Sequence, residues 1–134
     1  MYNVAIIGYG YWGPKLARNF QNSNFFNIKY IVDKSNKNLQ KARIDHPLCK
    51  LLNNYKLINQ NDVDLIVIAS PTKFHFVIAK YFLKNTNVLI EKPLSLKLKE
   101  VKKLELISKK KQKTFICRLS FFIFGFYKLY KENN

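Results

Sequence analysis

Short apolar runs recur along the chain, and each stops at a residue that favours a turn or carries a charge. The runs are rich in β-branched and aromatic side chains, as strands inside a sheet are. Two of them, VDLIVIAS and NVLI, are apolar almost throughout, which is typical of parallel strands covered on both faces. The predicted strands are residues 3–7, 27–32, 63–70 and 87–90, with shorter ones near 50–52 and over 114–118.

Helical patterns fill most of the segments between these strands. A helix over 14–22 begins with Pro14, whose missing N–H is harmless at the first helical position. A polar helix over 36–44 follows Ser35, a good N-cap residue. Apolar residues at helical spacing predict an amphipathic helix over 74–82, whose buried face is Phe74, Val77, Ile78, Tyr81 and Phe82. A last helix carries Leu98, Val101, Leu104 and Ile107 and ends in lysines, and a helical turn is expected near 55–58.

This alternation of strands and helices predicts an α/β fold with a doubly wound parallel sheet and right-handed crossovers. The 134 residues, 48% of them hydrophobic, suffice for one domain with a real core. The two cysteines, Cys49 and Cys117, form no CxxC pair, and the chain has two histidines. These counts exclude a disulfide framework and a thiolate or multi-histidine metal cluster, so no metal site is predicted.

No segment is typical of a targeting signal or a membrane span. The first apolar run, residues 4–7, is too short for a signal peptide and has no basic stretch before it. The most apolar stretch, residues 115–127, contains Arg118 and falls short of the ~20 residues that cross a bilayer. We therefore expect a cytoplasmic protein.

The formal net charge of +16 raises the alternative of a nucleic-acid partner. The cations, however, are 21 lysines and three arginines, and arginine is the better residue for bidentate phosphate and base contacts. Lys, Asn, Ile, Phe and Tyr supply about half of the chain, and these are the residues that an AT-rich coding sequence favours. Lysine can therefore accumulate on solvated faces without a role in binding. A basic nucleic-acid-binding protein is thus the less favoured interpretation, and it predicts a steeply salt-dependent affinity for DNA.

The candidate chemistry lies where the first strand ends. Gly8, Gly10 and Gly13 form G-x-G-x-x-G between a predicted strand and a predicted helix, and Asp33 follows Gly13 by 20 residues at the end of the next strand. This combination is the dinucleotide-binding fingerprint. Gly8 permits the tight turn, Gly10 lets the backbone approach a pyrophosphate, and Gly13 allows close packing of the helix on the strand.

Asp33 would accept hydrogen bonds from the adenosine ribose and repel a 2′-phosphate, which favours NAD over NADP, although Lys34 beside it leaves that preference open. The alternatives are ordinary turn glycines and a helix-capping aspartate. In an open α/β sheet, ligands bind at the carboxyl ends of the strands. Three loops should converge there, namely residues 8–13, 70–73 and 91–93.

GYGYWG, DLIVIASPTKFHF and EKPLS, in this order and spacing, resemble the N-terminal half of the Gfo/Idh/MocA oxidoreductase family over residues 1–124. The opening GYGYWGPKLARNF is most similar to its sugar-nucleotide branch. The resemblance implies an NAD(P)-binding Rossmann domain, with Lys92 as the catalytic candidate near the nicotinamide and a cis Lys92–Pro93 bond. It implies this set of cofactor-binding residues: Gly8, Gly10, Tyr11, Trp12, Gly13, Asp33, Ser70, Pro71, Thr72, His75, Glu91 and Lys92. From the residues alone, His75 could equally be a surface or capping residue, and Lys92 one more lysine among many.

The sequence departs from the family near its end. Arg118 and Leu119 stand where the family commonly has a Gly-His pair, and Phe124 and Gly125 where it has Asn-Pro. The family continues into a substrate-binding domain, so we expect a dinucleotide-binding domain over 1–118 and a remnant of the domain junction over 119–134. The expected function is a truncated dehydrogenase homologue with little or no turnover alone. Half of a split dehydrogenase that docks a separate substrate domain is an alternative, and a homo-oligomer stays open.

Overall fold

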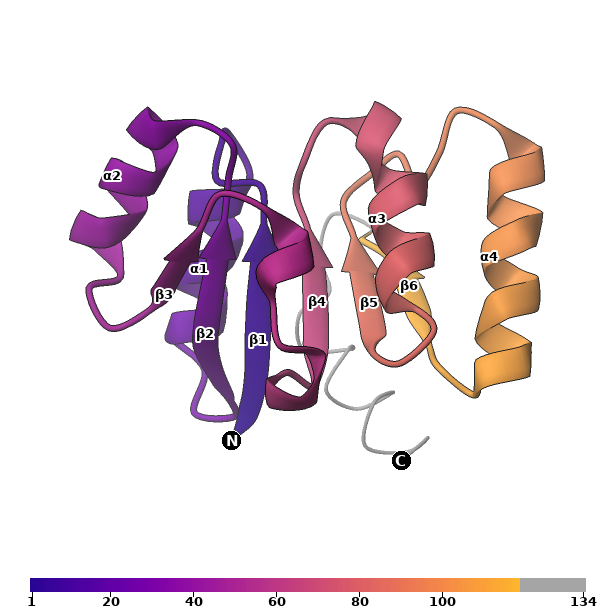
Figure 1. Cartoon of the computed structure of the whole chain (residues 1–134), viewed down its shortest axis with the longest axis horizontal. Coiled ribbons are helices and arrows are strands. Elements are labelled where there is room, and N and C mark those ends of the chain that lie inside the picture. The colour runs from indigo at the N-terminus through magenta and orange to yellow at the C-terminus, as the bar shows by residue number, and fades with distance from the viewer. Residues whose placement is uncertain (119–134) are drawn as a thin grey trace.

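The structure is a computed structural model, and it describes residues 1–118. The six strands form one parallel sheet in the order β3-β2-β1-β4-β5-β6 (Figure 1). They are β1 (Tyr2–Ile7), β2 (Phe26–Val32), β3 (Lys50–Leu52), β4 (Leu65–Ile68), β5 (Asn87–Ile90) and β6 (Phe115–Cys117). The predicted fold class is confirmed, and each predicted strand is present with ends that differ by at most two residues.

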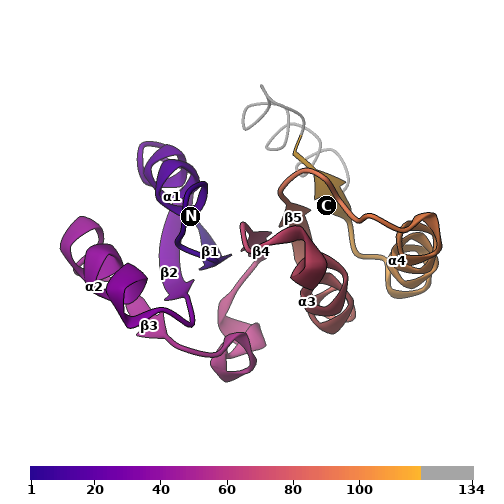
Figure 2. The same cartoon turned by 90° about the horizontal axis from the view of Figure 1, so that it is seen from above.

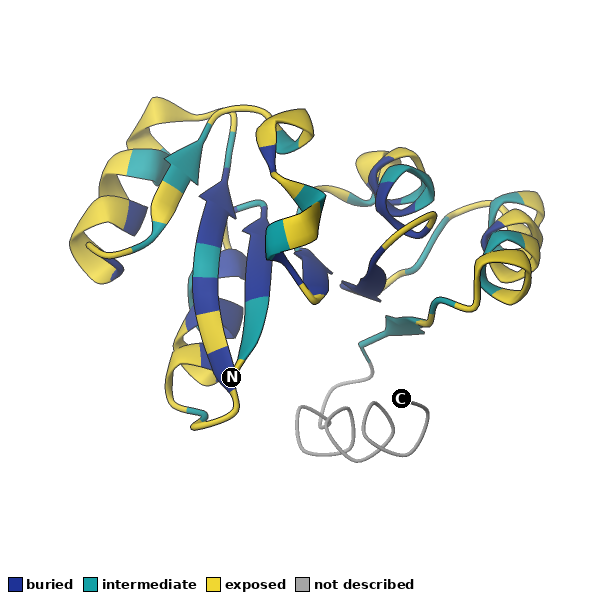
Figure 3. Cartoon of the chain, turned by 60° about the horizontal axis from the view of Figure 1, so that its bottom comes forward, coloured by how far each residue is buried: buried dark blue, intermediate teal, exposed yellow. Residues whose placement is uncertain are grey.

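The helices cover both faces of this sheet (Figure 2). They are α1 (Gly13–Gln21), α2 (Asn36–Asp45), α3 (His75–Phe82) and α4 (Leu98–Lys111), with 3-10 turns η1 (Tyr55–Leu57), η2 (Gln60–Asp62) and η3 (Thr72–Phe74). Helices α1 and α2 pack with Val4 and Ile6 of β1, whereas α3 and α4 pack on the face that carries Ala5 and Ile7. Alternate residues of one strand thus enter two cores, which explains the uninterrupted apolar runs. Figure 3 shows the central strands buried and the outer surfaces of the helices exposed.

The buried face of α3 differs from the predicted one. Phe74 and Val77 are 39% and 56% exposed, and the buried positions are His75, Ile78, Ala79 and Phe82. The reason is the 3-10 turn η3, which takes up Phe74 and starts the α-helix one residue later. The surface interpretation of His75 is therefore wrong.

Helix α4 also packs more lightly than predicted. Leu104 is its buried residue, whereas Leu98 is 70% exposed. At the start of α2, the Ser35 hydroxyl accepts a hydrogen bond from the backbone N–H of Asn38, at 3.4 Å, so the predicted cap is confirmed. Among residues 1–118, no helix is long and apolar enough to cross a membrane.

The strand order reverses beside β1. The chain runs outward from β1 to β2 and β3, then returns to β4 on the other side of β1 and continues to β5 and β6. At such a switch point, the loops after the two neighbouring strands diverge to opposite faces and leave a crevice at the carboxyl edge. The loops after β1, β4 and β5 all lie at this edge, as the sequence predicts.

Candidate functional site

The glycines of the first turn have different structural environments. Gly8 has φ +97°, a left-handed conformation that glycine adopts without strain, and a Cβ there would lie 2.6 Å from the backbone nitrogen of Ser70. A Cβ on Gly13 would overlap the carbonyl oxygen of Gly8. A Cβ on Gly10 would meet no heavy atom within 4 Å. Hence the fold requires Gly8 and Gly13, whereas the space at Gly10 is open to a ligand.

Asp33 faces this turn. Its carboxylate accepts hydrogen bonds from the backbone N–H of Tyr9 at 2.6 Å, the backbone N–H of Ser35 at 2.8 Å and the side-chain amide of Asn38 at 3.1 Å. These donors fix the carboxylate between the glycine turn and the start of α2. An anionic group in this place can receive the hydroxyls of a ribose laid across the end of β2.

Tyr9 supports the turn from below. Its side chain is buried, and its hydroxyl donates a hydrogen bond to Asp45 at 2.8 Å. Burial, together with this hydrogen bond, raises the pKa of Tyr9 well above its ordinary value. The phenol is thus a neutral structural group.

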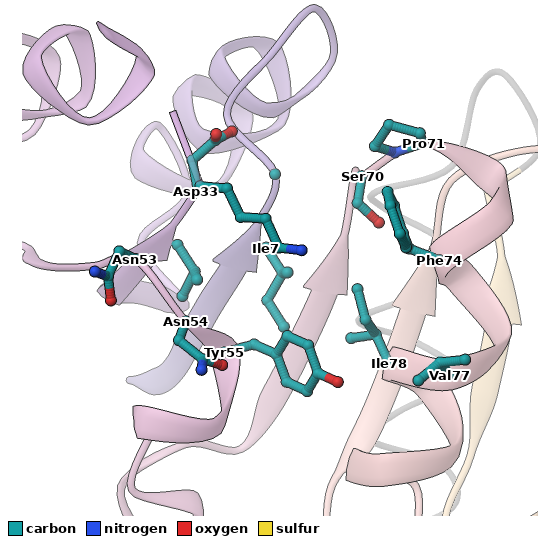
Figure 4. Close-up of a pocket in the computed structure, with 13 residues that line it drawn as sticks. Ile7, Asp33, Asn53, Asn54, Tyr55, Ser70, Pro71, Phe74, Val77 and Ile78 are labelled. Atoms are coloured by element: carbon teal, nitrogen blue, oxygen red, sulfur yellow. The ribbon is translucent and has the colours of Figure 1, made fainter. Parts of the chain in front are cut away.

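A cavity of about 380 Å³ opens beside the turn, between the ends of β1, β2 and β4 (Figure 4). Asp33 and Asn53 lie on one wall, and Ser70, Pro71 and Phe74 lie on the other. Other lining residues are Ile7, Gly8, Val32, Lys34, Asn54, Tyr55, Val77 and Ile78. A mostly apolar pocket with a few polar groups at this size is typical of small-molecule sites.

Two polar groups of this cavity are available to a ligand. The Ser70 hydroxyl oxygen is buried and has no hydrogen-bond partner among the described residues. The Lys34 ammonium lies 5.3 Å from the ring centroid of Phe74, and both residues line the cavity. The open face of Gly10, the fixed Asp33 carboxylate and the unpartnered Ser70 hydroxyl together fit the adenosine and pyrophosphate of a dinucleotide.

A second, smaller cavity of about 80 Å³ lies between Trp12, Glu91, Lys92 and Arg118. Glu91 is only 4% exposed and forms an ion pair with Arg118, whose guanidinium lies 4.8 Å from the Trp12 ring centroid. The backbone N–H of Lys92 donates to the other Glu91 oxygen at 3.1 Å, and the Lys92 side chain is exposed. The Lys92–Pro93 bond is cis, as the resemblance implies. A guanidinium beside an aromatic ring and an ion-paired carboxylate can hold a polar group at this place.

Other predicted site residues are placed less directly. Tyr11 is 74% exposed, and a hydrogen bond with Lys15 lowers its pKa. Pro71 lines the larger cavity, whereas Thr72 is half-buried at the start of η3 and is not among the lining residues. His75 is buried behind the loops, and both of its ring nitrogens contact backbone carbonyls. Whether these residues contact a cofactor stays a prediction.

Sequence reasoning missed the wall that Asn53, Asn54 and Tyr55 form. These residues directly follow β3, so the rule that parallel strands present their carboxyl ends to ligands could have found them. The strand itself is three residues long, and the segment after it carries little pattern. Arg118 was noted as a departure from the family, not as the partner of Glu91.

Comparison with known proteins gives a consistent answer. Residues 2–119 match the model of Gfo/Idh/MocA, described as an oxidoreductase family with an NAD-binding Rossmann fold. An uncharacterized oxidoreductase of Streptococcus pneumoniae is 25% identical over 118 residues, which are 87% of this chain and 32% of that protein.

Solved structures show the same fold. Biliverdin reductase of Synechocystis, in complex with biliverdin and NADP+, is 26% identical with a TM-score of 0.82 over 87% of this chain and 37% of that one. The apo scyllo-inositol dehydrogenase of Lactobacillus casei, at 19% identity and a TM-score of 0.80, covers 87% of this chain and 36% of that one, and shares the fold. The chain thus spans about a third of the length of these relatives.

Proposed function

The chain belongs to the Gfo/Idh/MocA oxidoreductase family and carries its NAD-binding Rossmann domain, and from this premise we propose how its residues hold the dinucleotide. The adenosine occupies the 380 Å³ cavity, with its ribose on Asp33. The pyrophosphate lies against Gly10 at the start of α1, where free N–H groups and the helix dipole favour anions. The open space at Gly10 is the observation that carries this proposal.

We further propose that the nicotinamide end lies by Trp12 and Lys92. When bound, this ring donates or accepts a hydride. Lys92 would contact the reacting oxygen of the substrate, and it would take the proton of a hydroxyl or donate a proton to a carbonyl oxygen. The ion pair with Arg118 balances the charge of the neighbouring Glu91. The proposed substrate is a sugar or sugar nucleotide, on the similarity of the opening motif to that branch. The residues that surround this substrate would belong to a second domain, either linked through residues 119–134 or supplied by a separate chain. We therefore expect residues 1–118 alone to show little or no turnover.

NAD is the proposed cofactor in preference to NADP. A 2′-phosphate on the adenosine ribose would approach the Asp33 carboxylate, and two negative groups in contact repel each other. Lys34 offsets part of this repulsion because its ammonium lies over the same cavity. We expect NADH to bind more tightly than NADPH, and Lys34→Ala to widen that difference.

Trp12 makes the test direct, because it is the single tryptophan of the sequence and borders the proposed site. Bound NADH should quench Trp12 fluorescence and gain emission by energy transfer, and calorimetric titration should give the same dissociation constant. Gly10→Val should abolish binding and leave the unfolding midpoint close to that of the unmodified chain, since its side chain enters open space. Asn24→Val, in an exposed turn before β2 at the opposite edge of the sheet, is the matched control. Unchanged NADH affinity in Gly10→Val would refute the proposed site.

A further inference from the structure

His75 is a buried histidine whose two ring nitrogens both lie within hydrogen-bond distance of backbone carbonyl oxygens. It is the first residue of α3 and is only 1% exposed. Its Nδ1 lies 3.0 Å from the carbonyl oxygen of Pro93, and its Nε2 lies 2.7 Å from the carbonyl oxygen of Ser70. Both partners are acceptors, so each contact needs an N–H on the ring.

A neutral imidazole carries one N–H, and its other nitrogen presents a lone pair. In the neutral form, one of these two contacts would set a lone pair against a carbonyl oxygen at hydrogen-bond distance. The doubly protonated ring donates to both oxygens. The two carbonyl oxygens thus satisfy both N–H groups of such a ring, and hydrogen bonds from a charged donor are the stronger kind.

The two carbonyls belong to loops that serve different ends of the proposed dinucleotide site. Ser70 follows β4, lines the larger cavity and packs against the glycine turn, since a Cβ on Gly8 would lie 2.6 Å from the Ser70 nitrogen. Pro93 follows Lys92, which lines the smaller cavity. In Figure 1, α3 begins on the side of the molecule toward which the arrowheads of β4 and β5 point. The ring of His75 therefore joins the two loops from the buried side, away from both cavities.

We propose that His75 is a positioning residue that, as an imidazolium, ties the Ser70 loop to the Lys92–Pro93 loop and so sets the spacing between the adenosine and nicotinamide ends of the site. The effect of His75 on dinucleotide binding rests on the proposed function. The two hydrogen bonds that join the loops do not. His75 acts through Ser70 and Lys92, and its ring nitrogens have no hydrogen-bonding capacity left for the cofactor.

The protonation of the ring can be tested on the unmodified, ligand-free chain. The sequence has two histidines, and the ¹⁵N shifts of both rings can be measured at neutral pH. We expect His75 to show hydrogens on both nitrogens. His46 is the internal control, because burial lowers its pKa and so favours the neutral ring. A neutral tautomer at His75 under these conditions would overturn the tie.

Two variants of His75 test its two hydrogen bonds separately. In His75→Asn, the side-chain amide nitrogen takes the place of Nδ1 and retains the Pro93 contact, whereas in His75→Gln it takes the place of Nε2 and retains the Ser70 contact. NADH and ADP-ribose, which lacks the nicotinamide, are the probes. His75→Gln should weaken NADH binding about tenfold, roughly the loss of one charge-assisted hydrogen bond, and change ADP-ribose binding less than about twofold. His75→Asn should weaken both ligands, because it releases the loop that lines the adenosine cavity.

The outcomes keep the two hypotheses apart. If the unmodified chain binds neither ligand, the proposed function fails, and the ¹⁵N measurement still decides the tie. If it binds both and His75→Gln weakens the two ligands equally, or neither, the positioning role is refuted. His46→Gln, at the other buried histidine, should leave both affinities unchanged.

Discussion

The ion pair between Glu91 and Arg118 gives the sharpest prediction about stability. Glu91 is 4% exposed and the Arg118 side chain 17%, so Arg118→Met leaves a buried carboxylate without its cation. Removal of one partner of a buried pair costs about 3–5 kcal/mol. We expect the lower end, about 3 kcal/mol, because the backbone N–H of Lys92 still donates to Glu91 and Arg118 is partly solvated. With a slope of about 2 kcal/mol per molar urea, the unfolding midpoint should fall by about 1.5 M.

The double variant Glu91→Gln with Arg118→Met decides whether the pairing causes this loss. When both charges are removed, the desolvation penalty goes with them, and stability should return to within about 1 kcal/mol of the unmodified chain. Urea unfolding followed by Trp12 fluorescence and by circular dichroism measures all four proteins of the cycle. Additive losses, with a coupling energy below about 0.5 kcal/mol, would refute the reasoning.

Three further predictions concern Gly13, His46 and Tyr9. Gly13→Ala should lower stability by about 1–3 kcal/mol, because its Cβ would overlap the Gly8 carbonyl, and an unchanged thermal midpoint would contradict that packing. Burial lowers the folded-state pKa of His46, so the unfolded chain binds the proton more readily; stability is full above the ordinary pKa of about 6.5 and is lost as pH falls below it. His46→Gln should flatten this slope in urea midpoints measured across pH, and equal slopes would argue against it. Tyr9→Phe should cost about 1 kcal/mol by loss of the hydrogen bond to Asp45, and calorimetry should find NADH affinity unchanged.

The strands could be predicted because each is an apolar run that enters two cores, and the pattern that reveals this is local. The buried face of α3 could not, since it depends on whether the segment after Pro71 begins as a 3-10 turn or as an α-helix. A shift of one residue rotates a helix by about 100° and replaces Phe74 and Val77 with His75 and Ala79 on the inner face. Periodicity could not have made this choice, because all four residues can be buried.

The site divides in the same way. The glycine turn and Asp33 have fixed spacing along the sequence and could be predicted from it. The pairing of Glu91 with Arg118 joins residues 27 apart, and it arises because β6 lies beside β5 in the sheet. The contacts of His75 likewise depend on β4 lying beside β5, because its two partners belong to the loops that follow these strands. Such contacts follow from sheet order, which an alternating pattern of elements leaves open.

A side chain at Gly10 should have opposite effects on the stability of the fold and on the binding of NADH. Glycine leaves the unfolded chain more conformational freedom than alanine does, so it lowers stability slightly wherever the fold does not need it. The fold shows no such need at Gly10, because its φ is not left-handed and an added Cβ would meet no heavy atom within 4 Å. Gly10→Ala should therefore stabilise the chain by about 0.4–1 kcal/mol, seen as a higher urea midpoint, if only the fold is considered. The added methyl group would occupy the space where the pyrophosphate approaches the backbone, so the same variant should bind NADH at least about tenfold more weakly. Higher stability with full NADH affinity would show that the open space serves no ligand, and lower stability would show that the fold itself needs this glycine.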